Sequence, residues 1–145
     1  MDNDKESRFS RVSHLKGKEI YMIGYITLGT NNLERAERFY NVLLKELGAT
    51  QTFKTGSSVS WGFGEKRPML TITQPFDRKP ASAGNGVMVA LMAKSRYVVD
   101  SFHAKALALG GKDEGAPDFR GDDFYVGYFR DLDGNKLNIF CYPCA

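Results

Sequence analysis

The amino-acid sequence predicts an α+β fold built from two tandem modules, each a strand, a helix and three further strands. Two observations favour this fold. The halves of the chain align at a shift of about 63 residues, so that residues 22–28 match residues 85–91. After each of these apolar stretches, hydrophobic residues recur at helical spacing, and several short strand-like stretches follow. We expect neither half to fold alone.

The first module is predicted over about residues 20–77. Residues 22–28 are rich in aliphatic side chains and form its first strand. Asn31, followed three residues later by Glu34, is typical of a helix-capping box, and the helix is expected to end at Gly48. Three strands are then expected at 50–54, 58–63 and 68–73.

The second module is predicted over about residues 84–143. Ser95 is expected to cap its helix, which Gly110 closes. Asp133 and Gly134 are typical of a two-residue hairpin turn between its last two strands. The strands that follow the helix are expected at 112–120, 124–130 and 136–142.

Length and composition favour a single domain. The chain has 145 residues, of which 42% are hydrophobic and 26% charged, as in ordinary globular proteins. Residues 1–18 have no strand or helix periodicity. We therefore expect a flexible N-terminal tail at 1–18 and one domain at 19–145.

Charge and hydropathy exclude several classes of partner. The net charge is +3, and residues 1–18 carry two of these charges, so the domain lacks the concentrated positive charge that nucleic-acid binding requires. The longest apolar run, residues 87–93, is far too short to cross a membrane. The N-terminal residues also lack the apolar stretch of a secretory signal, so we expect a cytoplasmic protein.

The strands are predicted to have one aliphatic face, which the helices cover. Alternate side chains of a strand point to opposite faces, and alternate positions of the matched strands are aliphatic. The opposite face mixes aromatic, soft and hydrogen-bonding side chains, which suits a small-molecule pocket; a second core face is the alternative. The aliphatic positions are Ile26, Leu28, Leu70, Ile72, Val87, Val89, Leu91, Leu137 and Ile139.

Four segments of the chain resemble a known family. They are MIGYITLGTNNLERAERFY, GNGVMVAL, SFHAKALALGG and YFRDLDGNKLNIFC. Together they are similar to the glyoxalase/bleomycin resistance protein/dioxygenase, or vicinal oxygen chelate, superfamily. The resemblance implies two βαβββ modules that form a curved mixed sheet around a central cavity, with the helices on the outer face. It also implies a homodimer.

The resemblance further implies where a metal ion would bind. Members of the family take metal ligands, usually His, Glu or Gln, from the first and fourth strands of each module. The matching positions here are Tyr25, Thr71, Met88 and Asn138, none of which carries the imidazole or carboxylate that Zn, Fe or Mn prefers. We therefore expect no metal and no cofactor, interpret these four residues as ligand-binding, and assign no catalytic residue.

Further candidates lie outside these four positions. Aromatic side chains on the third strand of each module could stack on a flat ligand or pack in the core. His103 is expected to be packed or hydrogen-bonded on the second helix. The C-x-x-C pair Cys141 and Cys144 is expected to be two free thiols, with an oxidised bridge or a weak metal site as alternatives. The aromatic candidates are Trp61, Tyr125 and Tyr128.

The predicted function is metal-independent binding or sequestration of a small amphipathic or aromatic compound. Sequestration requires affinity but no acid, base or metal, so it fits the residues present. The alternative is a metal-dependent lyase, isomerase or dioxygenase of the same superfamily, with metal ligands outside the matched positions. A third possibility is a structural or interaction domain with a filled cavity.

Overall fold

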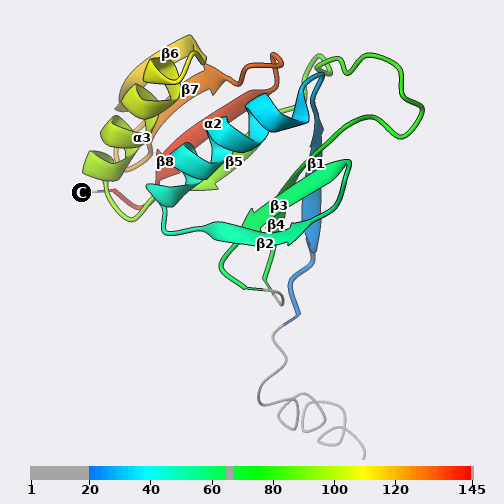
Figure 1. Cartoon of the computed structure of the whole chain (residues 1–145). Coiled ribbons are helices and arrows are strands. Elements are labelled where there is room, and N and C mark those ends of the chain that lie inside the picture. The colour runs from blue at the N-terminus through cyan, green and yellow to red at the C-terminus, as the bar shows by residue number, and fades with distance from the viewer. Residues whose placement is uncertain (1–19, 65–66, 145) are drawn as a thin grey trace, which may run out of the picture.

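The computed structural model describes residues 20–64 and 67–144, and within them each half of the chain forms a strand, a helix and three strands (Figure 1). The expected tail at 1–18 lies outside the described residues. Module 1 contains β1 (Tyr25–Gly29), α2 (Leu33–Lys45), β2 (Thr50–Lys54), β3 (Ser58–Gly62) and β4 (Met69–Thr73). Module 2 contains β5 (Val89–Met92), α3 (Arg96–Ala108), β6 (Lys112–Phe119), β7 (Tyr125–Arg130) and β8 (Lys136–Cys141).

The two modules have the same topology, which confirms the predicted fold class. The strand order is β1-β4-β3-β2 in one sheet and β5-β8-β7-β6 in the other. In each module the first strand pairs parallel with the fourth, while the other pairs are antiparallel. The strands thus form two separate four-stranded mixed sheets.

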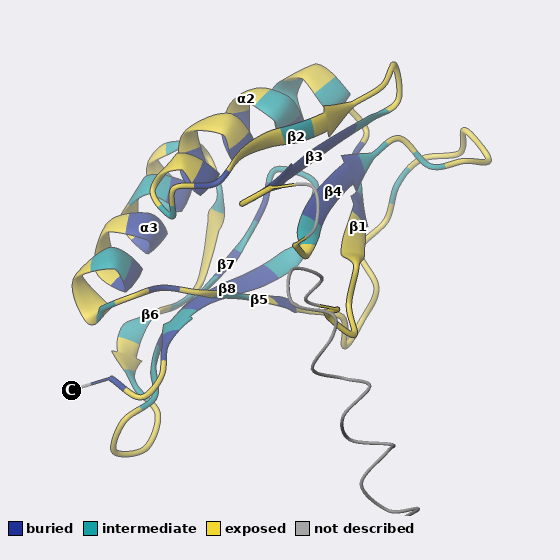
Figure 2. Cartoon of the chain, turned by 90° about the horizontal axis from the view of Figure 1, so that it is seen from below, coloured by how far each residue is buried: buried dark blue, intermediate teal, exposed yellow. Residues whose placement is uncertain are grey.

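Both helices cover one face of their own sheet and contact each other between the modules. α2 packs over β2, β3 and β4, whereas α3 packs over β6, β7 and β8. Figure 2 shows that the buried positions lie on the inward sides of the helices and along strands such as β3, β4 and β8. The other face of each sheet carries no helix, and we call it the open face. None of the helices in the described part of the chain is long and apolar enough to cross a membrane.

The aliphatic strand face forms the core as predicted, with two exceptions. Most of the predicted positions are buried beneath the helices, including Leu70, Ile72 and Leu137. Ile26 is 36% exposed, because it lies on the edge strand β1, which α2 does not cover. Val87 is 56% exposed, because it precedes β5. These two residues therefore do not belong to the core.

Tertiary contacts, as well as the local sequence, determine which residue caps each helix. Ser95 caps α3 as predicted, accepting a hydrogen bond from the backbone N–H of Val98. In α2 the cap is Asn32, whose Oδ1 accepts from the N–H of Arg35 at 3.0 Å. The predicted cap, Asn31, instead uses its side chain to bind the backbone of Ala81.

The turn between β7 and β8 is longer than the predicted two-residue hairpin. Arg130 and Lys136 are the last paired residues, so the loop contains residues 131–135. The Asp131 carboxylate accepts hydrogen bonds from the backbone N–H groups of Asp133 and Asn135, both at 2.9 Å. In a two-residue turn these N–H groups would instead be hydrogen-bonded between the two strands. The prediction of a two-residue turn is therefore wrong.

Candidate functional site

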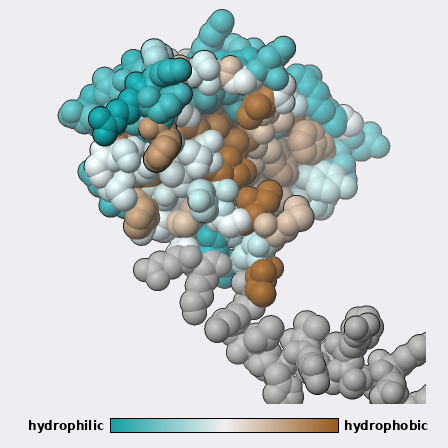
Figure 3. Space-filling view, turned by 90° about the vertical axis from the view of Figure 1, so that its right-hand side faces the viewer, coloured by the Kyte–Doolittle hydropathy of each residue, from teal (hydrophilic) through white to brown (hydrophobic). Residues whose placement is uncertain are grey.

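A hollow of about 540 Å³ lies on the open face of module 1. It is bordered by three bulky side chains, Tyr25, Phe53 and Met69, and by a group of hydroxyls. Figure 3 shows the side of the molecule on which β1 lies, with apolar side chains gathered near its centre and hydrophilic ones along its upper margin. The remaining lining residues are Thr27, Ser58, Ser60, Thr71 and Thr73.

The hydroxyls form two cross-strand pairs between β3 and β4. Ser60 Oγ and Thr71 Oγ1 are 2.7 Å apart, and Ser58 Oγ and Thr73 Oγ1 are also 2.7 Å apart. Each pair joins residues that are directly opposite in the antiparallel register. Hydroxyl groups donate and accept, so these pairs can reorient to bind a polar group of a ligand. The predicted residues Tyr25 and Thr71 thus line one hollow.

The open face of module 2 brings together Met88, Tyr128 and Asn138. Tyr128 and Asn138 are directly opposite in the β7–β8 register, and Asn138 Nδ2 lies 3.7 Å from Met88 Sδ. Asn138 is only 3% exposed, and its Oδ1 has no hydrogen-bond partner among the described residues. A buried carbonyl oxygen without a partner costs about 1–3 kcal/mol, so Asn138 holds an unsatisfied acceptor beneath the open face of module 2.

Trp61 and Tyr125 lie on the helix-covered faces, away from the other candidates. Trp61 is 2% exposed, donates from Nε1 to Asn41 Oδ1 on α2, and packs 5.6 Å from the ring of Tyr40. Tyr125 donates its hydroxyl to Asp100 Oδ1 on α3 at 2.6 Å, and this bond raises the pKa of Tyr125 to about 12. Both rings pack against helices, which agrees with the core-packing alternative for these two residues.

The other candidates occupy structural positions. His103 is buried, and its Nε2 lies 3.0 Å from the backbone oxygen of Tyr128 and 3.2 Å from Asp113 Oδ1. It is therefore hydrogen-bonded within module 2, as predicted. Cys141 and Cys144 are buried and unpaired, and burial raises the pKa of the Cys141 thiol to about 11. A high thiol pKa keeps Cys141 protonated and weakly reactive near neutral pH.

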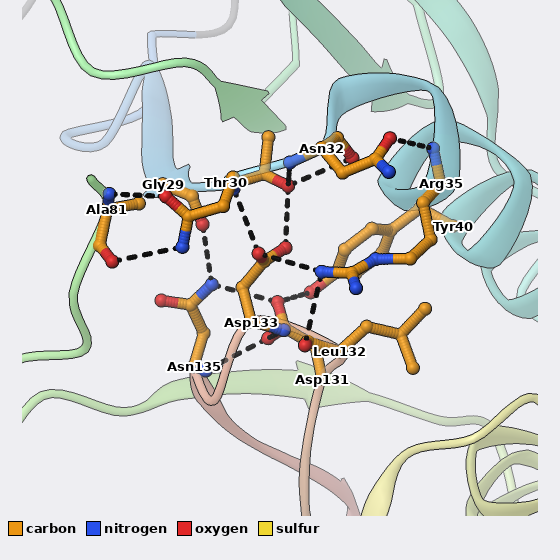
Figure 4. Close-up of polar contacts among 11 residues, drawn as sticks. Gly29, Thr30, Asn32, Arg35, Tyr40, Ala81, Asp131, Leu132, Asp133 and Asn135 are labelled. Atoms are coloured by element: carbon orange, nitrogen blue, oxygen red, sulfur yellow. Dashed lines mark hydrogen bonds and ion pairs between the residues drawn. The ribbon is translucent and has the colours of Figure 1, made fainter. Parts of the chain in front are cut away.

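A partly buried polar cluster, which we call the inter-module clasp, joins the end of β1 and the start of α2 to the β7–β8 loop (Figure 4). Asp133 is its centre: Oδ2 accepts from Thr30 Oγ1 at 2.6 Å, and Oδ1 accepts from the backbone N–H of Asn31 at 2.9 Å. Arg35 forms an ion pair with the same carboxylate at 3.1 Å. The clasp therefore fixes module 1 relative to module 2.

A second part of the inter-module clasp lies deeper. The hydroxyl of Tyr40 donates to Asp131 Oδ2 at 2.7 Å, and Asn135 Nδ2 donates to the backbone oxygen of Gly29 at 2.9 Å. Burial and the neighbouring Asp131 carboxylate raise the pKa of Tyr40 well above its ordinary value. These contacts hold β1, and with it one wall of the open-face hollow, in a fixed position.

The family model for the glyoxalase/bleomycin resistance protein/dioxygenase superfamily matches residues 22–139. The chain belongs to this superfamily. A glyoxalase/bleomycin resistance protein from Albidiferax ferrireducens T118 is 34% identical, and the match covers 85% of this chain and 100% of that one with a TM-score of 0.79. A search of curated proteins finds no match.

More distant solved structures share the fold. A glyoxalase-related enzyme from Fulvimarina pelagi is 21% identical, with a TM-score of 0.67 over 86% of this chain and 90% of that chain. A lactoylglutathione lyase from Agrobacterium tumefaciens is 23% identical, with a TM-score of 0.61 over 87% of this chain and 97% of that chain. At these identities the likeness extends to the fold alone.

The residues at the superfamily's metal-ligand positions do not fit a divalent transition metal. Tyr25, Thr71, Met88 and Asn138 carry hydroxyl, thioether and amide groups, and the hydroxyl of Thr71 is engaged with Ser60. Zn, Fe and Mn sites in proteins use imidazole, carboxylate or thiolate ligands. Within residues 20–64 and 67–144, no group of three or more His, Cys, Asp or Glu side chains is arranged to hold a metal.

Sequence reasoning missed Phe53, Ser58 and Ser60, which line the hollow. The alternation of side chains in β3 could have identified the two serines. They alternate with Val59 and Trp61, which are buried beneath α2, so the serines must point to the opposite, open face. Phe53 gives no such signal, since it belongs to a strand in which four of the five residues are exposed.

Proposed function

We propose that this glyoxalase-superfamily protein binds a small amphipathic or aromatic compound at the open sheet faces, without a metal ion. The observation that carries the proposal is the hollow on module 1, where Tyr25, Phe53 and Met69 surround paired hydroxyls. Concave apolar surfaces with a few placed polar groups are the usual form of small-molecule sites. The unpartnered Oδ1 of Asn138 is a further hydrogen-bond acceptor, buried beneath the open face of module 2.

The chemistry of the lining residues favours binding over catalysis. The hollow is lined by hydroxyl, thioether and aromatic groups, and no carboxylate or imidazole lines it. General acid–base catalysis near neutral pH depends mostly on groups of those two kinds. Sequestration of the compound requires only affinity, which the hollow supplies by burying apolar surface and pairing a few polar groups.

We propose that a second copy of the chain covers the open faces. Tyr25, Phe53 and Met92 are 64%, 59% and 64% exposed, and the edge strands β1 and β5 each leave one side unpaired within the described chain. Exposed apolar side chains and open sheet edges favour association, and two-fold dimers are the commonest homo-oligomers. Sedimentation should give about twice the mass of 16.2 kDa, and a monomer at micromolar concentration would contradict this proposal.

We also propose that the protein works in the cytoplasm. Two buried cysteines, Cys141 and Cys144, are free thiols, and such pairs persist in reducing compartments. Thiol labelling of the unfolded protein directly after cell lysis should modify both residues. Recovery of a fully oxidised form would contradict this location.

The alternative function is that of a metal-dependent lyase, isomerase or dioxygenase. The fold shared with a lactoylglutathione lyase favours it, whereas the neutral side chains of Tyr25, Thr71, Met88 and Asn138 oppose it. Elemental analysis after dialysis separates the two functions. About one firmly bound metal ion per chain that is lost in Asn138→Ala would favour the metal-dependent enzyme over metal-independent binding.

Fluorescence titration with anilinonaphthalene, a neutral and apolar probe, tests the binding function. Phe53→Ala removes an aromatic wall of the hollow, and we expect the probe affinity to fall about tenfold, since a buried aromatic ring contributes more than 1 kcal/mol. Phe63→Ala is the matched control, because Phe63 is 62% exposed and does not line the hollow. Titrations with and without a chelator should agree.

Three results would overturn the proposal. One is a wild-type protein that does not bind the probe. Another is an equal loss of affinity in Phe53→Ala and Phe63→Ala, which would place binding outside the hollow. The third is binding that disappears in chelator.

A further inference from the structure

A second and larger hollow, of about 900 Å³, adjoins the open-face hollow of module 1. It lies where the linker after β4, from Gln74 to Pro80, passes the ends of β1 and β4 and the start of β3. Ser58 and Thr73 line both hollows, so one hydrogen-bonded hydroxyl pair forms their common border. A molecule that fills the first hollow can therefore extend past this pair into the second. We call the second hollow the linker pocket.

The linker pocket differs from its neighbour in charge. Arg78 and Lys79 are its only ionisable lining residues, and no carboxylate lines it. Neither side chain forms a hydrogen bond or an ion pair with any other residue that the structure describes. The nearby Asp77 is turned to the backbone, where its Oδ1 accepts from the N–H of Lys79 at 3.0 Å. Two cationic groups thus face this pocket without an anionic partner.

The backbone holds Arg78 in an unusual conformation. Its φ is 60°, and Arg78 is the only non-glycine residue with positive φ in the described chain. A side chain in this left-handed region is disfavoured, and such strain clusters at functional sites. The linker is fixed by hydrogen bonds on both sides: Gln74 N–H donates to the Ser57 oxygen, and Ala81 N–H donates to Asn31 Oδ1. The linker is therefore tied to the body of module 1 on either side of Arg78.

From this arrangement we propose that the linker pocket binds the anionic end of the ligand, a carboxylate, phosphate or sulfonate, through Arg78 and Lys79. The apolar part of the same molecule occupies the hollow between Tyr25, Phe53 and Met69. The ligand class is thus an amphipathic anion. This inference rests on the proposed function, since it assumes that the open-face hollow takes the apolar part. The hydroxyls of Ser58 and Thr73 lie at the junction and can bind polar atoms between the two parts.

Two probes that differ only by an anionic group test the inference. Anilinonaphthalene sulfonate carries one negative charge, and anilinonaphthalene has the same rings without it. The double variant Arg78→Gln/Lys79→Gln should weaken sulfonate binding about tenfold and leave the affinity for the neutral probe within about twofold, because exposed ion pairs contribute modestly but additively. Lys94→Gln/Lys112→Gln removes the same charge from exposed positions outside the pocket and should change neither affinity.

Three further measurements sharpen the test. Raising the salt concentration should weaken sulfonate binding in the wild type more than in Arg78→Gln/Lys79→Gln, since salt screens the ion pairs. Arg78→Gly removes the charge but suits the left-handed backbone, so it should keep the thermal unfolding midpoint and still lose sulfonate affinity. Inorganic phosphate should compete with the sulfonate probe but not with the neutral one.

The outcomes separate this inference from the proposed function. If the neutral probe binds and the affinity for the sulfonate probe is unchanged in Arg78→Gln/Lys79→Gln, the proposed anion subsite is refuted. The proposed binding at the open-face hollow then still holds. An equal loss of affinity for both probes in that variant also overturns the inference. So does a loss of sulfonate affinity in Lys94→Gln/Lys112→Gln as large as that in Arg78→Gln/Lys79→Gln. If neither probe binds the wild type, the proposed function fails and this inference fails with it.

Discussion

Replacing Asp133 with alanine tests whether the inter-module clasp holds the two modules together. The Asp133 side chain is 4% exposed and accepts hydrogen bonds from Thr30 Oγ1 at 2.6 Å and from the backbone of Asn31 at 2.9 Å, in addition to its ion pair with Arg35. Asp133→Ala removes all three contacts. Thr30 is 1% exposed, so its hydroxyl stays buried when its anionic acceptor is lost.

The expected loss of stability is about 3 kcal/mol. Hydrogen bonds to charged groups contribute about 1.5–3 kcal/mol each. We take the lower value for both bonds, because the Thr30 hydroxyl can still donate to the backbone oxygen of Asn32 at 3.1 Å. Arg35 is 41% exposed, so its ion pair is screened and adds only a few tenths of a kcal/mol.

Urea unfolding measures this change directly. The midpoint should fall while the slope of free energy against denaturant stays constant, which indicates a loss of stability without a change of the folded state. Asp122→Ala is the matched control: Asp122 is exposed and outside the inter-module clasp, so its effect should stay within about 0.5 kcal/mol. A loss below about 1 kcal/mol in Asp133→Ala would refute the reasoning.

Tyr40→Phe deletes the 2.7 Å bond to Asp131 and should lower the free energy of unfolding by about 1–2 kcal/mol, measured by urea unfolding; an unchanged midpoint would contradict it. Stability should also fall with alkaline pH. Folding raises the pKa of Cys141 from about 9 to about 11 and that of Tyr125 from about 10 to about 12, so the folded state retains protons that the unfolded state has lost. The stabilisation is present below about pH 9 and is lost as the pH rises to about 12, and Tyr125→Phe should flatten the upper part of this decline. Arg78→Gly should leave the free energy of unfolding unchanged within about 1 kcal/mol, because relief of the left-handed strain offsets the greater freedom of the unfolded glycine.

The repeat and the alternation of apolar residues were sufficient to predict the order of helices and strands in each module, whereas the mixed sheet was implied by the family resemblance. Both are local properties of the chain, and a strand that exposes the wrong face would leave residues such as Ile72 and Ile139 in water. The same local patterns predicted Ser95 as a cap but chose Asn31 over Asn32. Two adjacent asparagines have equal capping chemistry, and only the contact of Asn31 with Ala81, 50 residues away, decides between them.

The site was predictable only in part, for similar reasons. Tyr25 and Thr71 were placed correctly on one face, because their strands alternate clearly with aliphatic neighbours. Trp61 and Tyr125 were grouped with them by residue type, yet their hydrogen bonds to α2 and α3 place them on the covered side. The linker pocket depends on the path of a loop, and no periodicity in the sequence fixes that path around Arg78.

A two-dimensional NMR titration of the full chain with anilinonaphthalene, in the presence of a chelator, tests most directly whether the open face binds small molecules without a metal. We predict that the amide signals of Ser60, Met69 and Thr71 shift in a saturable manner, whereas those of Val99 and Phe102, on the buried face of α3, do not. Shifts confined to the helices, or shifts at the open face that occur only after a divalent metal is added, would contradict metal-independent binding at this site.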